Sequence, residues 1–572
     1  MLESNAKGVS HKALVENSKL ESASSASSAA FPDHDPQKKT AIKILFLSSD
    51  TGGGHRASCE SLAKQFQLLF PGSSYVLQDA IDGYFPMPKT YKHLSAHPTQ
   101  WKVFYEVTNS RAFEMLADAN MKLVCERGTR RKIMDIDPDV VISVHPLMTN
   151  VPQLSCAKIS QKTGKHIPIF TVVTDLGSAH CLWFANSMEK MFVGSDQIWD
   201  LAKKRGNVPD EKLVKIGLPI RHDFALQAEN LGDRISSEGK EYQKSIRQSL
   251  GLTHLDRPTL LVMGGGEGVG SLSNIVNSLY TELVMNGIDA TILVVCGRND
   301  KLKQDLKGRN WNNVLRIQSD LKATQVHRNF TSMCSGGAMV PSPTASCIEG
   351  PMTNSIRKIL SSGSLSVASP LLTSDEKGSM EVAGSRSCED LNKPILEVSS
   401  FEEKGGESNE PERQVQKDES SRSSDESITE TDPLGNVEVI GLGFINNMAE
   451  YMVAADVLVS KAGPGTISEA AAVSLPVMLT SFLPGQEEGN VDFVLDGGFG
   501  SYINDSDPAR IAEEVALWLR DEKKYENLCR SAKAKGAPYA ARDIAKAIGD
   551  STLKWKEINE ENGKGSISSL TQ

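Results

Sequence analysis

The chain has little of several features that mark particular classes of protein. No run of about 18 apolar residues occurs, so no membrane-spanning helix is predicted. The nine cysteines form no CxxC pair, which indicates reduced, buried thiols in a non-oxidising compartment. The net charge is -10, which argues against a nucleic-acid-binding protein because such proteins usually carry a basic domain.

Two stretches also lack the apolar periodicity of folded elements. Residues 1–41 have no apolar core of a secretory signal and are Ser/Ala-rich, which is typical of a plastid transit segment or of a disordered tail. Glu3, Glu16 and Glu21 make this stretch more acidic than transit segments usually are. Residues 318–435 are rich in Ser and Glu and predict a disordered insertion.

What the chain does have is a strand, a glycine turn and a helix near its beginning. The run Ile42–Leu47 predicts a buried parallel strand, and helical spacing starts at Ala57. Glycines between them let the backbone approach a ligand, and a helix N-terminus favours anions. His55 stands at the mouth of this turn, where it can accept a proton. An ordinary turn whose histidine caps the helix accounts for the pattern equally well.

Two further predicted strands end in polar residues. His145 follows the run 140–144, and Asp175 follows the run 169–173. Because ligands bind beyond the carboxyl ends of parallel strands, we expect these residues to meet His55 at one edge of a sheet. A buried polar cap at a single strand would be ordinary, but three together indicate a site.

Aromatic and lysine residues alternate in the segment 82–111. This mixture suits an interface with anionic lipid headgroups, although a surface excursion whose aromatics fold back onto the core is the alternative. The residues expected to face an acceptor or lipid are Tyr84, Phe85, Lys89, Lys92, Trp101 and Lys102, together with His145 and Asp175.

The second half repeats the strand and glycine-turn pattern at 259–268. A dinucleotide site is rejected because position 269 is Val269 where a third glycine is required, and because the next strand ends in Gly297-Arg298 without an acidic residue. A later turn, 461–466, precedes a helix that carries Glu469. A carboxylate there can accept two sugar hydroxyls, or it can be a solvated acid favoured by the helix dipole.

These patterns predict an α/β protein with two Rossmann-like domains. We expect a disordered N-terminal segment (1–41), an acceptor and membrane domain (42–225), a charged helical connector (226–257), a nucleotide-sugar domain (258–317 and 436–550), the insertion (318–435) and a C-terminal tail (551–572).

An ordered set of motifs carries a family resemblance. The motifs are SDTGGGHRAS at 49–58, SVHPLM at 143–148, VTDL at 173–176 with His180, GLPIR at 217–221, MGGGEG at 263–268, GFI at 443–445, KAGPGTISEA at 461–470 and GQEEGN at 485–490. Together they resemble the plant-type monogalactosyldiacylglycerol synthases, inverting glycosyltransferases of family 28. The resemblance implies a GT-B fold, in which two parallel sheets face an interdomain cleft. The long insertion departs from the family pattern.

The resemblance also implies a reaction and a site. The donor would be UDP-galactose and the acceptor diacylglycerol, with inversion, no cofactor and no essential metal. His55 matches the general base. The residues that match the donor site or lie beside it are Gly53, Gly54, Gly265, Gly266, Phe444, Ile445, Gly465, Thr466, Glu469, Gln486, Glu487 and Asn490. Without a DxD at a strand end, helix N-termini and turn amides would stabilise the leaving diphosphate.

The expected partners are a UDP-sugar, diacylglycerol and anionic lipids at a membrane surface, with no nucleic acid and with a homodimer left open. The expected location is peripheral on the plastid envelope. Three alternatives stay open: a UDP-glucose-dependent diacylglycerol glucosyltransferase, a soluble GT-B epimerase or hydrolase, and a non-catalytic lipid or nucleotide binder.

Overall fold

The computed structural model describes residues 40–49, 53–79, 93–94, 97–264, 272–321 and 434–570, with side chains to 562. The chain divides into two compact units, and the described residues all belong to the unit formed by Met1–His327 and Thr431–Gln572. The predicted insertion lies outside the described residues except at its ends, where 318–321 continue a helix and 434–435 precede a strand.

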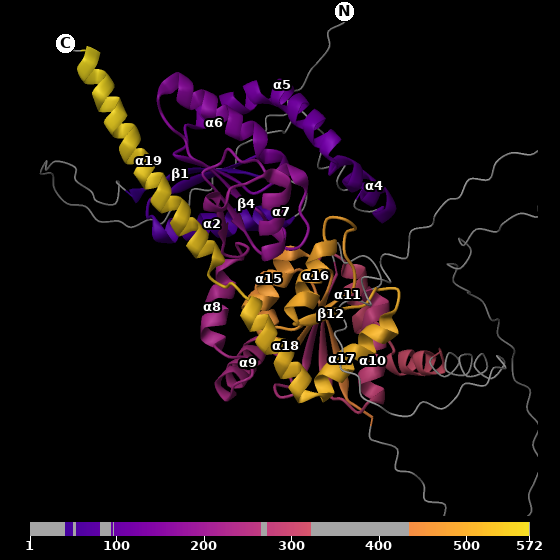
Figure 1. Ribbon diagram of the computed structural model, residues 1–572. Coiled ribbons are helices and arrows are strands. Elements are labelled where there is room, and N and C mark those ends of the chain that lie inside the picture. The colour runs from indigo at the N-terminus through magenta and orange to yellow at the C-terminus, as the bar shows by residue number, and fades with distance from the viewer. Residues whose placement is uncertain are drawn as a thin grey trace, which may run out of the picture. The chain divides into compact units, whose positions relative to one another are not determined.

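The first half is built on a six-stranded parallel sheet in the order β2-β1-β3-β4-β5-β6 (Figure 1). Its central strands are buried on both faces, which explains their continuous apolar sequences. The strands are β1 (Lys43–Leu47), β2 (Ser74–Gln78), β3 (Val140–Ser143), β4 (Ile169–Val172), β5 (Lys190–Val193) and β6 (Leu213–Lys215).

Helices connect these strands. They are α2 (Gly53–Leu69), α4 (Pro98–Thr108), α5 (Arg111–Ile136), α6 (Asn150–Thr163) and α7 (Asp196–Gly206), with the short 3₁₀ helices η1 (Pro146–Met148), η2 (Cys181–Trp183) and η3 (Asp210–Lys212). Helix α2 begins at Gly53, four residues before the predicted start at Ala57. Gly53, Gly54 and His55 therefore lie in its first turn, where backbone N–H groups have no partner within the helix.

The second half has a parallel sheet of the same size, in the order β12-β11-β10-β7-β8-β9. Its strands are β7 (Thr259–Met263), β8 (Ala290–Val295), β9 (Val437–Leu442), β10 (Val457–Ser460), β11 (Val477–Leu479) and β12 (Gly500–Tyr502). Its helices are α10 (Leu272–Met285), α11 (Asp300–Gly308), α14 (Met448–Ala454), α15 (Pro464–Ala472), α16 (Glu488–Gly497), α17 (Pro508–Arg520) and α18 (Glu522–Lys535). The two sheets confirm the predicted pair of Rossmann-like domains.

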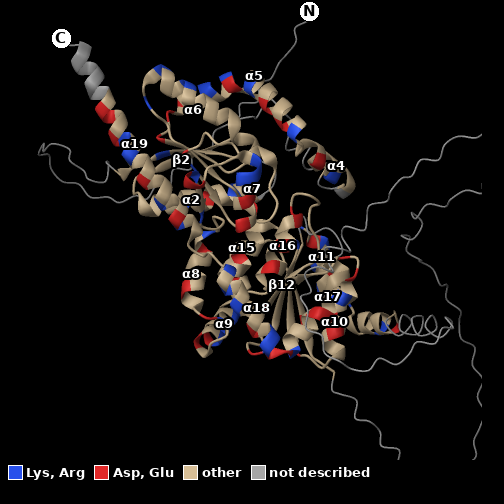
Figure 2. Cartoon of the chain, viewed as in Figure 1, with Lys and Arg blue, Asp and Glu red and all other residues tan. Residues whose placement is uncertain are grey.

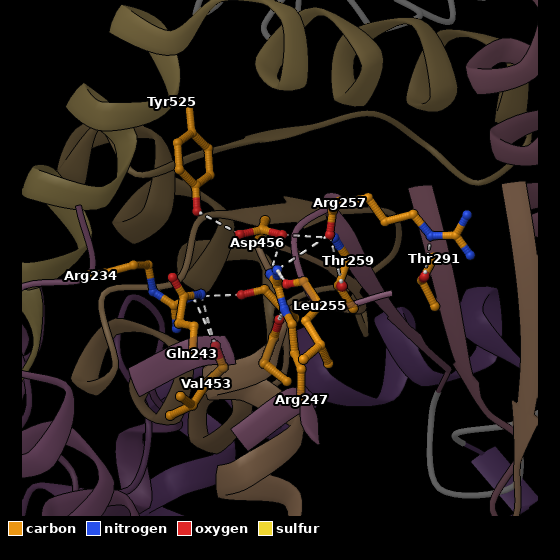
Figure 3. Close-up of polar contacts among 12 residues, drawn as sticks. Arg234, Gln243, Arg247, Leu255, Arg257, Thr259, Thr291, Val453, Asp456 and Tyr525 are labelled. Carbon is orange, nitrogen blue, oxygen red and sulfur yellow. Dashed lines mark hydrogen bonds and ion pairs between the residues drawn. The ribbon is translucent and has the colours of Figure 1, made fainter. Parts of the chain in front are cut away.

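The connector between the halves forms helices α8 (His222–Leu231) and α9 (Ser237–Ser249). Its side chains bond the C-terminal carbonyls of α14, as Figure 3 shows for part of this network. Arg234 Nη2 donates to Met452 O at 2.9 Å, and Arg247 Nε donates to Ala454 O at 2.8 Å. Carbonyls at a helix C-terminus have no partner within the helix, so these arginines satisfy them. The connector is thereby joined to the second half.

The last helix, α19 (Ala540–Leu570), returns to the first half. Ile544 and Ile548 belong to the same buried cluster as Phe46 and Phe66, so α19 packs on α2. Residues 551–570, which the sequence analysis sets apart as a tail, continue this helix. The start of this extension is held to the first half, because Leu553 packs against the same cluster and Lys556 Nζ donates to Ala41 O at 2.8 Å.

Candidate active site

His55 lies in the first turn of α2, beyond the end of β1. Its Nδ1 is hydrogen-bonded to Thr174 Oγ1 at 2.9 Å, and its ring meets the His145 ring edge-on with 4.8 Å between centroids. Burial lowers the pKa of His55 to about 4, although a hydrogen bond to the Val144 carbonyl raises it. The imidazole is therefore neutral near pH 7, the form that can accept a proton.

His145 and Asp175 follow β3 and β4, as expected. His145 is buried, and its Nδ1 accepts a hydrogen bond from Leu147 N at 3.3 Å. Burial holds its pKa well below the usual value, and the nearby histidines lower it further. Asp175 is also buried, and its Oδ2 accepts from Trp183 Nε1 at 2.8 Å. Burial raises the pKa of Asp175 to about 7 although the indole bond lowers it.

These three side chains share one cavity of about 310 Å³. Its polar lining also includes His180 and Gln486, and the rest of the wall is mostly apolar and aromatic. The apolar and aromatic lining residues are Trp101, Phe104, Tyr105, Phe113, Leu116, Ala117, Met121, Pro146, Leu147, Leu182 and Trp183. The cavity combines proton-accepting groups with an apolar wall, which suits an acceptor with a hydroxyl on an apolar body.

His180, which belongs to the motif that begins with VTDL at 173–176, also lines the cavity, although the sequence predicts no role for it. Its Nε2 lies 3.3 Å from Thr108 Oγ1, and burial lowers its pKa to about 4. The contribution of α5 to the cavity wall was missed entirely. The sequence does indicate an apolar face on α5, because Phe113, Ala117 and Met121 recur at a spacing of four and so share one side of the helix.

The residues predicted to face lipid lie in different places. Trp101 is only 6% exposed and lines the cavity, so it faces the acceptor side and not the protein surface. Lys102 is exposed, and its Nζ lies 3.9 Å from Glu106 Oε1. Tyr84, Phe85, Lys89 and Lys92 lie outside the described residues.

The predicted donor residues lie in the second half, except for Gly53 and Gly54. Phe444 is 69% exposed after β9, and Ile445 is half-buried against the core. Gly465 and Thr466 lie in the first turn of α15, where a Cβ at Gly465 would meet open space. An accessible helix N-terminus is a favourable place for a phosphate. Gly265 and Gly266 lie outside the described residues.

Glu469 has a partner that the sequence analysis missed. Arg221 Nε donates to Glu469 Oε1 and Arg221 Nη2 donates to Oε2, both at 2.7 Å. Burial raises the pKa of Glu469, while Arg221 lowers it. A carboxylate offers about four acceptor positions, so Glu469 retains capacity for hydroxyl groups.

Three neighbouring predicted residues have different surroundings. Gln486 lines the cavity, and its carbonyl accepts from Ser178 Oγ at 2.7 Å. Glu487 Oε1 pairs with Lys461 Nζ at 2.7 Å. Asn490 is fully buried, and its Oδ1 accepts from the backbone N–H groups of Leu176 and Gly177, each at 3.2 Å.

The contacts of Asn490 tie the loop after β4 to α16. The backbones meet so closely there that a Cβ on Gly177 would lie 1.6 Å from Gly489 O. Asn490 Nδ2 also donates to Ala462 O at 3.0 Å. The Asn490 amide is thus hydrogen-bonded to backbone groups of both halves and links them.

Among the residues that the structure describes, no group of three or more His, Cys, Asp or Glu side chains is placed to hold a metal ion. Within the same residues, no helix has the length and apolar character needed to cross a membrane.

Comparison with known proteins identifies two family domains. The model described as monogalactosyldiacylglycerol (MGDG) synthase matches residues 55–220, and the glycosyltransferase family 28 C-terminal domain matches residues 382–547. The second match supports the GT-B type of the two-sheet architecture.

Similar proteins and structures were also found. A probable monogalactosyldiacylglycerol synthase 2, chloroplastic, from Oryza sativa subsp. indica is 27% identical over 523 residues, which cover 89% of this chain and 81% of that protein. A monogalactosyldiacylglycerol synthase, chloroplastic, from Spinacia oleracea is 26% identical over 491 residues, covering 83% of this chain and 66% of that protein. The crystal structure of Acinetobacter baumannii MurG matches with a TM-score of 0.44 and 11% identity, covering 89% of this chain and 99% of that chain.

Proposed function

The chain belongs to the monogalactosyldiacylglycerol synthase family of glycosyltransferases, and from this premise we propose that it transfers galactose from UDP-galactose to 1,2-diacylglycerol. The observation that carries the proposal is the largely apolar cavity whose lining includes His55, His145 and Asp175. A diacylglycerol presents one hydroxyl on an apolar body. The cavity matches both parts of that acceptor, because aromatic walls take the apolar part and proton acceptors face the hydroxyl.

The mouth of this cavity supports delivery of the acceptor from a membrane. Leu116 lines the cavity and is nevertheless 70% exposed, so the cavity opens along α5. Other exposed apolar side chains lie on the same two helices, between the charged residues that Figure 2 shows along them. They are Val103, Val107, Met115, Leu123 and Val124. Exposed apolar side chains gathered in this way mark an interaction surface.

Basic residues on α5 complement this apolar surface. Arg127 and Arg131 are exposed on the helix, and each basic residue near an anionic leaflet contributes about 1 kcal/mol of attraction. We therefore assign the protein to the surface of a membrane that contains anionic lipid. The relatives are named as chloroplastic, which supports our proposal that this membrane is the plastid envelope.

For the donor we propose the second half. The first turn of α15, with Gly465 and Thr466, would take the diphosphate, Glu469 the ribose hydroxyls, and the segment around Phe444 the uracil. Stabilisation of the leaving diphosphate by backbone N–H groups and Arg or Lys side chains is among the largest contributions to catalysis of group transfer. This assignment requires no resident metal.

For the acceptor we propose that His55 takes the proton of the attacking hydroxyl. The oxygen then forms its bond to C1 of galactose on the face opposite UDP, and UDP leaves with the electron pair of the broken bond. A positioned base contributes about 10²–10⁴-fold to the rate. Thr174 holds the His55 ring by the hydrogen bond at Nδ1.

The test is a transfer assay with mixed vesicles of diacylglycerol and anionic phospholipid. Incubation with UDP-galactose should yield monogalactosyldiacylglycerol with the β configuration, and UDP-glucose should be a poor donor. Product from UDP-glucose alone would establish the glucosyltransferase alternative. Consumption of the UDP-sugar without any glycolipid would indicate an epimerase or hydrolase, which the apolar cavity disfavours.

A further inference from the structure

Asp175 has a carboxyl group that is only partly used by the protein. Its Oδ2 accepts the indole hydrogen bond of Trp183, while Oδ1 has no hydrogen-bond partner among the described residues. The residue is 6% exposed and lines the cavity, so the carboxyl oxygen that the protein leaves unused is available to a molecule in the acceptor chamber.

We propose that Asp175 is a catalytic residue of this site, and that its unpartnered oxygen holds the proton released by the acceptor hydroxyl. The inference rests on the proposed function and extends it. The hydroxyl O–H bond and the bond between galactose C1 and UDP break, and the bond between the acceptor oxygen and C1 forms. UDP leaves with its electron pair, and the proton passes through His55 to Asp175.

The surroundings of Asp175 support this direction of proton movement. The pKa of Asp175 is about 7 and that of His55 is about 4, so the carboxylate is the stronger base of the two. An acid or base whose pKa is close to the working pH is also the most effective in proton transfer. The pKa of Asp175 is high because burial disfavours its charge, and the charge of Glu487 raises it further.

The other titratable groups around the cavity do not change charge near pH 7. Burial lowers the pKa of His180 to about 4, and it holds the pKa of His145 well below its usual value. Burial raises the pKa of Tyr105 above its usual value, and the charge of Asp175 adds to this shift. Glu487 is paired with Lys461. Asp175 is thus the cavity group expected to titrate in the neutral range.

The first experiment compares pH–rate profiles of the wild-type protein and Asp175→Asn on mixed vesicles. The wild type should lose kcat as the pH falls through about 7, because Asp175 must be ionised to receive the proton. Asp175→Asn keeps an oxygen for the Trp183 bond but cannot take a proton, so kcat should fall about 10²-fold or more and the decline near pH 7 should disappear. UDP affinity measured by calorimetry should stay unchanged.

The second experiment uses Trp183→Phe, which removes the indole bond and leaves the carboxyl group in place. That bond lowers the pKa of Asp175, so its loss should move the acidic limb of the profile to higher pH. A purely structural role for Trp183 would lower kcat without moving the limb. This variant also provides a test if Asp175→Asn does not fold.

A third measurement needs no turnover. Infrared difference spectra of the wild-type protein should show a protonated-carboxyl band that is lost near pH 7 and is absent in Asp175→Asn. If the wild type forms no galactolipid, the proposed function is refuted. The infrared band would still show whether the Asp175 carboxyl titrates near pH 7. If galactolipid forms but Asp175→Asn retains the wild-type kcat and pH profile, or if no carboxyl band titrates in the neutral range, the inference is wrong.

Discussion

Replacement of Met115 and Leu123 by aspartate should release the protein from membranes without damaging its chemistry. The two side chains are 70% and 85% exposed on α5, and neither lines the cavity. Full burial of a side chain of this size is worth about 1.5–3 kcal/mol, so their partial insertion contributes about 2–5 kcal/mol to membrane binding. Aspartate in the apolar layer adds a further cost. Vesicle affinity should therefore fall at least about 30-fold, since 1.4 kcal/mol corresponds to a factor of ten.

The assay is co-sedimentation with vesicles of neutral and anionic phospholipid containing diacylglycerol. Leu226→Asp is the matched control, because Leu226 is 46% exposed on α8, away from α4 and α5. The control should sediment as the wild type does. Turnover of a detergent-dispersed, short-chain acceptor should be preserved in the double variant. If the double variant and the control bind vesicles equally, the assignment of α4 and α5 as the membrane surface is refuted.

Other substitutions test the catalytic, donor and structural assignments. His55→Ala should lower kcat about 10²-fold or more with unchanged UDP affinity by calorimetry, and lost UDP binding with retained turnover would move His55 to the diphosphate site. Glu469→Gln should raise the donor KM in steady-state assays and leave kcat nearly unchanged, because it weakens contacts made before and during the reaction alike. Asp175→Asn should raise the thermal midpoint more at pH 8 than at pH 5. The raised pKa of Asp175 means that its ionisation destabilises the folded protein, and this cost grows from about pH 4 to about pH 7 and is complete above it. Asparagine cannot ionise and so removes the cost. Asp456→Ala should cost about 3–5 kcal/mol, seen as a lower thermal midpoint, because its arginine partner is buried. Asp256→Ala, which breaks an exposed pair with Lys244, should leave the midpoint nearly unchanged in the same assay.

The family, the class of fold and part of the cavity were accessible from sequence because they depend on short-range patterns. Apolar runs followed by glycine turns specify parallel strands that deliver residues to one edge of a sheet. That rule correctly grouped His55, His145 and Asp175 around one cavity. The composition of 82–111 predicted an interface with lipid headgroups, with aromatics that fold back onto the core as the alternative. Two of its aromatic residues, Trp101 and Tyr105, are buried and line the cavity.

Only tertiary structure decided which of these residues face a ligand and which hold the protein together. Arg221 and Glu469 are 248 positions apart, and no local pattern relates them. Asn490 braces two loops because the backbones of Gly177 and Gly489 touch. Trp101 lines the cavity together with residues of α5, and α19 leaves the second half to cover α2. Local propensity fixes the elements, but long-range packing selects the neighbours of each side chain, and those neighbours determine its burial, charge and pKa.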